Sequence, residues 1–133
     1  MQNMAIDGDR LWASLVEMAQ IGATEKGGVN RQALTELDGQ GRDLFVRWCE
    51  ASGCTVSFDA MGCTIRVDAV GNIYARRAGK DNALAPVMTG SHLDTQPTGG
   101  KYDGVFGVLS GLEVIRTLND LGVETERPVE VTV

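Results

Sequence analysis

Three side chains in the segment GSHLDTQPTGGKYDG, residues 90–104, have types and a spacing that could bind a metal ion. His92 is the only histidine of the chain, and Asp94 follows it two residues later. Neutral imidazole is the commonest metal ligand in proteins, and its second ring nitrogen usually donates a hydrogen bond to a carboxylate. We therefore predict that His92 binds a metal ion and that Asp94 folds back to orient the His92 ring within the catalytic site.

The third side chain, Asp103, stands at the start of a helical pattern, where the helix dipole favours a negative charge. A carboxylate at this place could bridge two metal ions, and Gly99 and Gly100 would let the backbone approach the ions and a substrate. Two simpler interpretations stay open at this point. Asp103 could be an ordinary helix N-cap, and a single histidine after a strand is more often structural than a metal ligand.

Three helices are expected to surround this segment. Apolar periodicity predicts them over residues 7–22, 38–52 and 103–121. Their expected N-caps are Asp7 or Asp9 for the first helix and Asp38 for the second. Gly104, Gly107 and Gly111 form a strip along the third helix, and we expect this strip to let the helix approach a sheet closely.

The strands are expected to present His92 at one edge of a sheet. The apolar run at residues 85–92 predicts a short buried strand, and open α/β sheets place their sites at the carboxyl ends of strands. The other expected elements are a loop at 21–34, a hairpin formed by the near-repeats 53–61 and 62–70, and strands at 72–79 and 129–133. The order predicts an α/β fold with helices packed on a mainly parallel mixed sheet. Because the last strand has no turn or polar tail after it, we expect the native chain to continue.

Composition excludes several classes of function. The chain has 133 residues, 43% apolar and 23% charged, which is typical of one soluble globular domain. Its net charge of −6 argues against a nucleic-acid partner or an anionic membrane partner. No apolar run reaches the roughly 20 residues of a membrane span, and no secretory signal precedes the first helix. Cys49, Cys54 and Cys63 lack CxxC spacing, so we expect reduced thiols in a cytoplasmic protein.

The segment GSHLDTQPTGGKYDGVFGVLSGLEVIRTLNDLG resembles the metal-ligand segment of the M20-type amidohydrolases. The branch it resembles contains N-carbamoyl-L-amino-acid hydrolases, β-ureidopropionases and allantoate amidohydrolases. KGGVNRQALTELDGQGRDLFVRWCEASGC and VDAVGNIYARRAG resemble preceding parts of the same branch, so the resemblance covers about residues 8 to 133. The sequence TQPTGGKYDG resembles that of the carbamoyl-amino-acid and ureidopropionate hydrolases more closely than that of the allantoate enzymes.

The resemblance implies that residues 1–133 are the N-terminal part of a zinc-peptidase-like catalytic domain. It implies two divalent metal ions, zinc or manganese with cobalt or nickel as alternatives, and a homodimer for the full-length protein. His92 would bind one ion, Asp103 would bridge both, and Asp94 would orient His92. The substrate would be an N-carbamoyl-L-amino acid or N-carbamoyl-β-alanine, cleaved at its ureido C–N bond.

The family's centre also needs a glutamate base, an adjacent glutamate ligand and two further histidines, and its lid and dimerisation domain carries part of the substrate site. No residue of this sequence matches these groups. We therefore expect the chain alone to bind metal weakly and to be inactive. Alternatives within the family are an allantoate amidohydrolase and an M20 peptidase or aminoacylase. An alternative of another class is a non-catalytic remnant that acts as an interaction module, with the terminal strand 129–133 as an unpaired edge.

Overall fold

The computed structural model describes residues 4–57, 66–67 and 71–133 of the chain. The helices of the described part are α1 (Gly8–Met18), α2 (Glu36–Ala51) and α3 (Val105–Asp120). Its strands are β1 (Thr55–Ser57), β2 (Arg66–Val67), β3 (Ile73–Arg77), β4 (Val87–Gly90) and β5 (Val129–Thr132). All three helices and the strands that were predicted at 72–79, 85–92 and 129–133 are therefore present.

The sheet has the strand order β1-β3-β5-β4, and β2 also pairs with β3. The α/β class and the mixed sheet are confirmed, but the prediction of a mainly parallel sheet is wrong for the described strands. Only β4 and β5 are parallel, whereas β1, β2 and β5 all run antiparallel to β3. The physical reason is the connection between strands, because a parallel pair needs a long crossover and only α3 supplies one here.

The strands β4 and β5 differ from the sequence predictions in their positions in the sheet. β4, predicted to be buried, lies at the edge of the sheet, and Val87 and Met88 are 58% and 52% exposed. The terminal strand β5, predicted as a possible unpaired edge, lies between β3 and β4 and pairs with both. The apolar residues of β4 predict a strand but not its place in the sheet. Pairing with strands far along the chain decides which strand lies at the edge.

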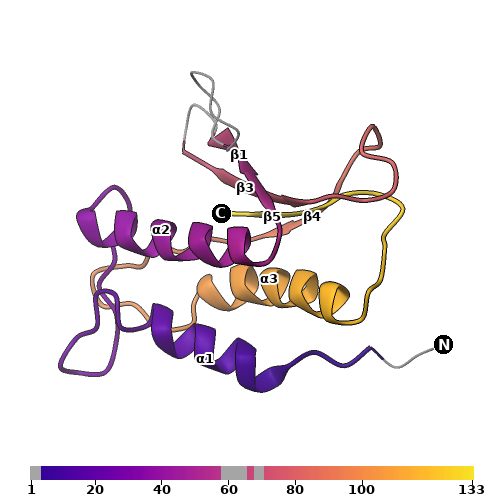
Figure 1. Cartoon of the computed structure of the whole chain (residues 1–133). Coiled ribbons are helices and arrows are strands. Elements are labelled where there is room, and N and C mark those ends of the chain that lie inside the picture. Colours follow the sequence, from indigo (N-terminus) through magenta and orange to yellow (C-terminus); the bar gives the residue numbers. More distant parts are fainter. Residues whose placement is uncertain (1–3, 58–65, 68–70) are drawn as a thin grey trace.

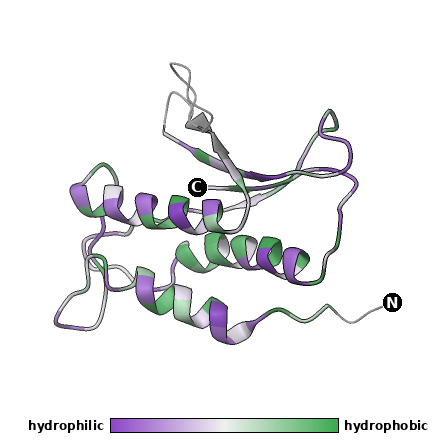
Figure 2. Cartoon of the chain, viewed as in Figure 1, coloured by the Kyte–Doolittle hydropathy of each residue, from purple (hydrophilic) through white to green (hydrophobic). Residues whose placement is uncertain are grey.

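The helices and the sheet enclose one apolar core. In Figure 1, α3 lies between α1 and the sheet, and it contacts both β4 and β5. α2 lies beside α3 and contacts β1. Figure 2 shows that α3 is apolar around much of its circumference, as expected for the helix covered by both layers. The fully buried core side chains include Met18, Phe45, Ile73, Leu93, Leu109, Leu112 and Ile115.

The helix ends follow local capping chemistry. Of the two predicted caps of α1, Asp7 is the N-cap and Asp9 is not, and Asp7 Oδ1 accepts a hydrogen bond from the Arg10 amide at 2.9 Å. The prediction of Asp38 as the cap of α2 is wrong, because Thr35 is the N-cap and its hydroxyl accepts from the Asp38 amide. Asp38 instead accepts a hydrogen bond from the Leu34 amide at 3.0 Å. Both residues thus satisfy backbone N–H groups at the start of α2.

The predicted hairpin of near-repeats falls largely outside the described residues. Its described parts, β1 and β2, each pair with β3. The remainder, residues 58–65 and 68–70, is outside the described part of the chain.

The glycine strip of α3 brings this helix against β4 and β5, as the sequence predicts. A Cβ on Gly111 would lie 2.9 Å from Thr89 Cγ2 and 3.1 Å from Val131 Cγ1. A Cβ on Gly107 would lie 2.9 Å from Ser91 Cβ. The absence of side chains at these two positions therefore sets the distance between the helix and the strands.

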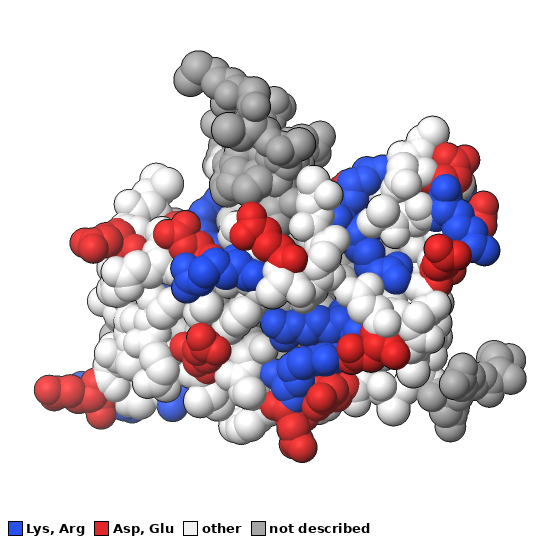
Figure 3. Space-filling view, viewed as in Figure 1, with Lys and Arg blue, Asp and Glu red and all other residues white. Residues whose placement is uncertain are grey.

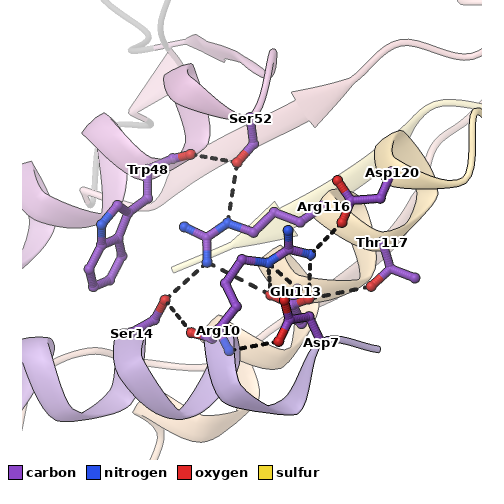
Figure 4. A network of polar contacts seen from close by, with 9 residues as sticks. All are labelled: Asp7, Arg10, Ser14, Trp48, Ser52, Glu113, Arg116, Thr117 and Asp120. Carbon is purple, nitrogen blue, oxygen red and sulfur yellow. Dashed lines mark hydrogen bonds and ion pairs between the residues drawn. The ribbon is translucent and has the colours of Figure 1, made fainter. Parts of the chain in front are cut away.

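A polar network on the other side of α3 joins the three helices (Figure 4). The buried carboxylate of Glu113 accepts hydrogen bonds from Arg10 of α1, the shortest at 2.7 Å. The same Arg10 pairs with Asp120 at 2.8 Å. Arg116 reaches Ser14 of α1 at 3.0 Å and the hydroxyl of Ser52, just after α2, at 3.4 Å. Hydrogen bonding to Glu113 raises the pKa of Arg10, which favours the charged guanidinium.

The distribution of surface charge and the apolar character of the helices concern possible nucleic-acid and membrane partners. On the face shown in Figure 3, Lys and Arg side chains lie beside Asp and Glu side chains. None of the described helices has the length and apolar character needed to span a membrane.

Candidate metal centre

His92 lies two residues beyond the carboxyl end of β4, where the sequence predicts it. The main chain there is still held by the sheet, since the Ser91 amide donates to the Thr132 carbonyl at 3.2 Å. The His92 side chain is 50% exposed. The parallel pair of β4 and β5 thus presents the imidazole at one edge of the sheet.

Asp94 contacts one nitrogen of the His92 ring. His92 Nδ1 lies 3.0 Å from the Asp94 carbonyl oxygen and 3.3 Å from Asp94 Oδ1. Both atoms are acceptors, so Nδ1 carries the proton that it donates to Asp94 when the ring is neutral. The lone pair is then on Nε2, which faces away from Asp94.

Asp103 lies on the Nε2 side of the ring. Its Oδ2 is 4.0 Å from His92 Nε2, and its side chain is 81% exposed. The N-cap of α3 is Gly104, and the helix start has no side-chain cap hydrogen bond. The interpretation of Asp103 as the helix N-cap is therefore wrong, and its carboxylate is not used for that purpose.

Gly104 makes the approach of His92 and Asp103 possible. A Cβ at this position would lie 2.4–2.5 Å from three atoms of the His92 ring, and the φ of +70° is one that glycine adopts without strain. The imidazole therefore packs directly on the backbone between Asp103 and α3. The sequence pattern places Gly104 on the glycine strip of α3 but does not predict this contact, and its only signal is the position of Gly104 directly after Asp103.

The glycines of the preceding turn differ from each other. A Cβ on Gly99 would lie 2.8 Å from Thr95 Cβ, so this position needs a glycine. A Cβ on Gly100 would have no atom within 4 Å, so this position leaves open space beside the turn.

Two open hollows flank the imidazole. One, of about 290 Å³, is lined by His92, Asp94, Thr95, Gln96 and Asp103. The other, of about 500 Å³, lies against His92 and Asp94 as well, and it extends to Arg42, Leu34 and Val133. The end of β5 therefore opens into the same hollow as the two candidate site residues.

The donor set suits a divalent ion but does not complete a site for one. Imidazole nitrogen and carboxylate oxygen without thiolate are ligands for zinc, manganese, cobalt or nickel. His92 Nε2 and Asp103 Oδ2 face each other across the smaller hollow. Among the described residues, however, no group of three or more His, Cys, Asp or Glu side chains could hold a metal ion. The described part of the chain thus supplies two candidate ligands.

The segment 29–31 forms hydrogen bonds with the turn at residues 95–99. The amide and carbonyl of Val29 pair with those of Gly99, both at 3.0 Å. The Arg31 amide donates to Thr95 Oγ1, and the Thr95 amide donates to the Arg31 carbonyl, both at 2.7 Å. The sequence predicts a loop here and the structure has one, but these pairings went unpredicted because the segment lacks strand periodicity.

Similar proteins support one family. No family model matches the chain. The N-carbamoyl-L-amino-acid amidohydrolase of Rhizobium meliloti is 53% identical over 98% of this chain and 29% of its own length. A ureidoglycolate hydrolase of Oryza sativa is 38% identical over 95% of this chain and 24% of its own length.

The fold agrees with the sequence comparison. The crystal structure of a hydantoinase/carbamoylase family amidase from Burkholderia multivorans matches with a TM-score of 0.91 at 58% identity, over 99% of this chain and 30% of that one. The chain therefore spans about a third or less of the relatives that it matches. Within that span, the chain is similar in both sequence and fold to amidohydrolases of the hydantoinase/carbamoylase family.

Proposed function

We propose that the chain is the N-terminal portion of the catalytic domain of a metal-dependent amidohydrolase that cleaves the ureido C–N bond of N-carbamoyl-L-amino acids. The observation that carries the proposal is the arrangement of His92, with Asp94 on Nδ1 and Asp103 facing Nε2. The substrate class rests on the name of the Rhizobium meliloti relative. The ions are two per complete site, with zinc or manganese preferred over cobalt or nickel.

Each of the three residues has a separate part in this site. His92 would hold one ion through its imidazole, and the carboxylate of Asp103 would help to hold both ions. Asp94 keeps the proton on Nδ1 and so fixes the tautomer and the orientation of the ring. When bound, the ions supply Lewis acidity and lower the pKa of water toward neutrality. The overall reaction consumes water and releases the amino acid, carbon dioxide and ammonia.

The remaining groups of the site lie outside this chain in our proposal. Val133 lines the hollow that also contains His92 and Asp94, so sequence following β5 would enter the site at that point. A glutamate from there would act as the general base. We also propose that the lid and dimerisation domain follows, that the full-length protein is a homodimer, and that it is cytoplasmic. The described cysteines, Cys49 and Cys54, are free and buried, as is usual in a reducing compartment.

A second substrate class is favoured by the plant relative. The ureidoglycolate hydrolase of Oryza sativa is 38% identical, so a ureido acid other than an N-carbamoyl amino acid is the second candidate. The higher identity of the Rhizobium meliloti enzyme, 53%, places the N-carbamoyl-L-amino acids first.

The test is hydrolysis by the native protein at the length at which its source cells make it. A panel would contain N-carbamoyl-L-amino acids, N-carbamoyl-β-alanine, allantoate, ureidoglycolate, an N-acetyl amino acid and a dipeptide. We expect metal-dependent ammonia release from an N-carbamoyl-L-amino acid, and its loss in His92→Ala and Asp103→Asn. The 133-residue chain alone should release no ammonia. Preferred hydrolysis of the dipeptide or the N-acetyl amino acid would replace the proposal with a peptidase or an aminoacylase.

A further inference from the structure

Arg31 is a fully buried arginine directly behind the candidate metal site. Its side chain is 0% exposed. The guanidinium donates through Nε to the carbonyl of Leu93 at 3.0 Å, and Leu93 is the residue between His92 and Asp94. Nη1 donates to the carbonyls of Met18 and Ile21 at 3.0 and 2.7 Å. One side chain thus joins the end of α1 to the turn that carries the candidate ligands.

The backbone of Arg31 holds the same turn a second time. Its amide donates to Thr95 Oγ1, and its carbonyl accepts from the Thr95 amide, both at 2.7 Å. The turn is therefore fixed at Leu93 by the side chain and at Thr95 by the main chain. Asp94 lies between these two points, and His92 directly precedes them.

Burial of this arginine has a cost in free energy that an apolar side chain would avoid. Burial lowers the pKa of Arg31, and attraction by Asp38 and Asp94 opposes that shift. Nη2 has no hydrogen-bond partner within the described part of the chain. α2 is shaped to accept the side chain, because a Cβ on Gly41 would lie 2.9 Å from Arg31 Cδ. The protein thus accommodates a buried charge where packing alone would not need one.

We propose that Arg31 is a positioning residue of the metal site. By holding the Leu93 carbonyl and Thr95, it sets the His92 ring between Asp94 and Asp103 and so raises the affinity of the site for a divalent cation. This inference rests on the proposed function, since it takes His92 and Asp103 as ligands of the cation. Arg31 itself does not contact the ion.

The test uses Zn²⁺ as the probe and the 133-residue chain as the protein. Because His92 is the only histidine, its ring resonances in an NMR titration report zinc binding without ambiguity. We expect Arg31→Met to weaken zinc affinity by about tenfold, as for other residues that orient a metal ligand. The zinc affinity of Arg31→Lys should lie between those of Arg31→Met and the wild type, because an ammonium can replace only part of the hydrogen bonds to the carbonyls.

The matched control is Arg116→Met, which removes an arginine with a 14% exposed side chain from the helix network. We expect it to lower the melting temperature but to change zinc affinity less than twofold. An equal loss of affinity in Arg116→Met and Arg31→Met at equal melting temperature would show that general destabilisation is the cause, and would overturn the inference.

Two further outcomes separate the inference from the proposed function. Zinc binding that shifts the His92 resonances in the wild type and equally in folded Arg31→Met overturns the inference alone. If Arg31→Met does not fold, the same result in Arg31→Lys overturns it. Absence of any zinc-dependent shift of His92 in the wild type contradicts the site itself, and the inference falls with it.

Discussion

At the scale of single residues, Gly104 controls how His92 and Asp103 face each other, because the imidazole occupies the space of its missing Cβ. We expect Gly104→Ala to displace the His92 ring and to destabilise the fold by about 1–3 kcal/mol, since alanine is also strained at a φ of +70°. The displacement would appear as a change in the His92 ring resonances, and the stability change in urea denaturation. Gly100→Ala is the matched control, since nothing lies within 4 Å of its Cβ position. Unchanged His92 resonances in Gly104→Ala would contradict this account.

The buried thiols give a prediction on pH. Burial raises the pKa of Cys54 from 9.0 to about 11, and it raises that of Cys49 further still. At pH 8 the thiolate fraction of Cys54 should therefore fall about a hundredfold on folding, from about a tenth to about a thousandth. In a Cys63→Ser variant, iodoacetamide should label the native chain far more slowly than the urea-unfolded chain. Equal rates would show that the thiols are accessible.

The same shift sets a direction for stability. A group whose pKa is raised on folding stabilises the native state below its unfolded pKa, and this contribution is lost as the pH rises through the folded pKa. The free energy of unfolding should therefore decrease between about pH 9 and pH 11. Replacing Cys54 with alanine should flatten this decrease, as urea denaturation across that range would show.

His92, Asp94 and Asp103 could be proposed as site residues from the sequence, because histidine and aspartate are common ligand types and lie close together in the chain. The roles of Arg31 and Gly104 could not be predicted from the sequence. Arg31 acts on residues 62 and 64 positions away, and only the folded chain brings them together. The role of Gly104 lies in the space it leaves for the His92 ring, which no pattern of residue types records.

At the scale of elements, the distance between α3 and the sheet depends on Gly111. Alanine favours a helix over glycine by up to about 1 kcal/mol, yet a Cβ at Gly111 would collide with Thr89 and Val131. We expect Gly111→Ala to destabilise the protein by about 1–3 kcal/mol through overpacking. Gly39→Ala in α2, where nothing lies within 4 Å, should stabilise it. Urea denaturation of both variants measures this, and two changes of the same sign would contradict it.

The attachment of α1 to α3 depends on the buried carboxylate of Glu113. Glu113→Gln would leave Arg10 and Arg116 with a neutral partner, and we expect a loss of about 3 kcal/mol. Asp120→Asn is the control, because Asp120 pairs with the same Arg10 but is 58% exposed, and its loss should be below about 1 kcal/mol. Thermal or urea unfolding distinguishes them, and comparable losses would show that burial does not govern the network.

The sequence predicts the elements more accurately than their arrangement. Helical periodicity located all three helices, and glycines 53 and 122, both with positive φ, follow α2 and α3 as expected. The edge position of β4 and the antiparallel pairing of β3 with β5 were not predictable, because they depend on contacts between segments more than 35 residues apart.

At the scale of the whole molecule, we propose that this chain is a part of a longer enzyme. The chain spans 29% of the Rhizobium meliloti relative, so the native protein should be several times heavier than the 14.2 kDa of this sequence. The intact mass of the protein from its source cells measures this directly. A mass near 14.2 kDa would favour a non-catalytic remnant, although β5 is paired on both sides and cannot be the free edge of an interaction module.

We propose that His92 and Asp103 bind the same divalent ion. The most direct test is a Zn²⁺ titration of the 133-residue chain, followed on the ring nitrogens of His92 by ¹⁵N NMR. We predict that zinc shifts Nε2 while Nδ1 keeps its proton toward Asp94, and that Asp103→Asn weakens binding more than Asp9→Asn does. Zinc binding through Nδ1, or equal affinity in Asp103→Asn and the wild type, would contradict the claim.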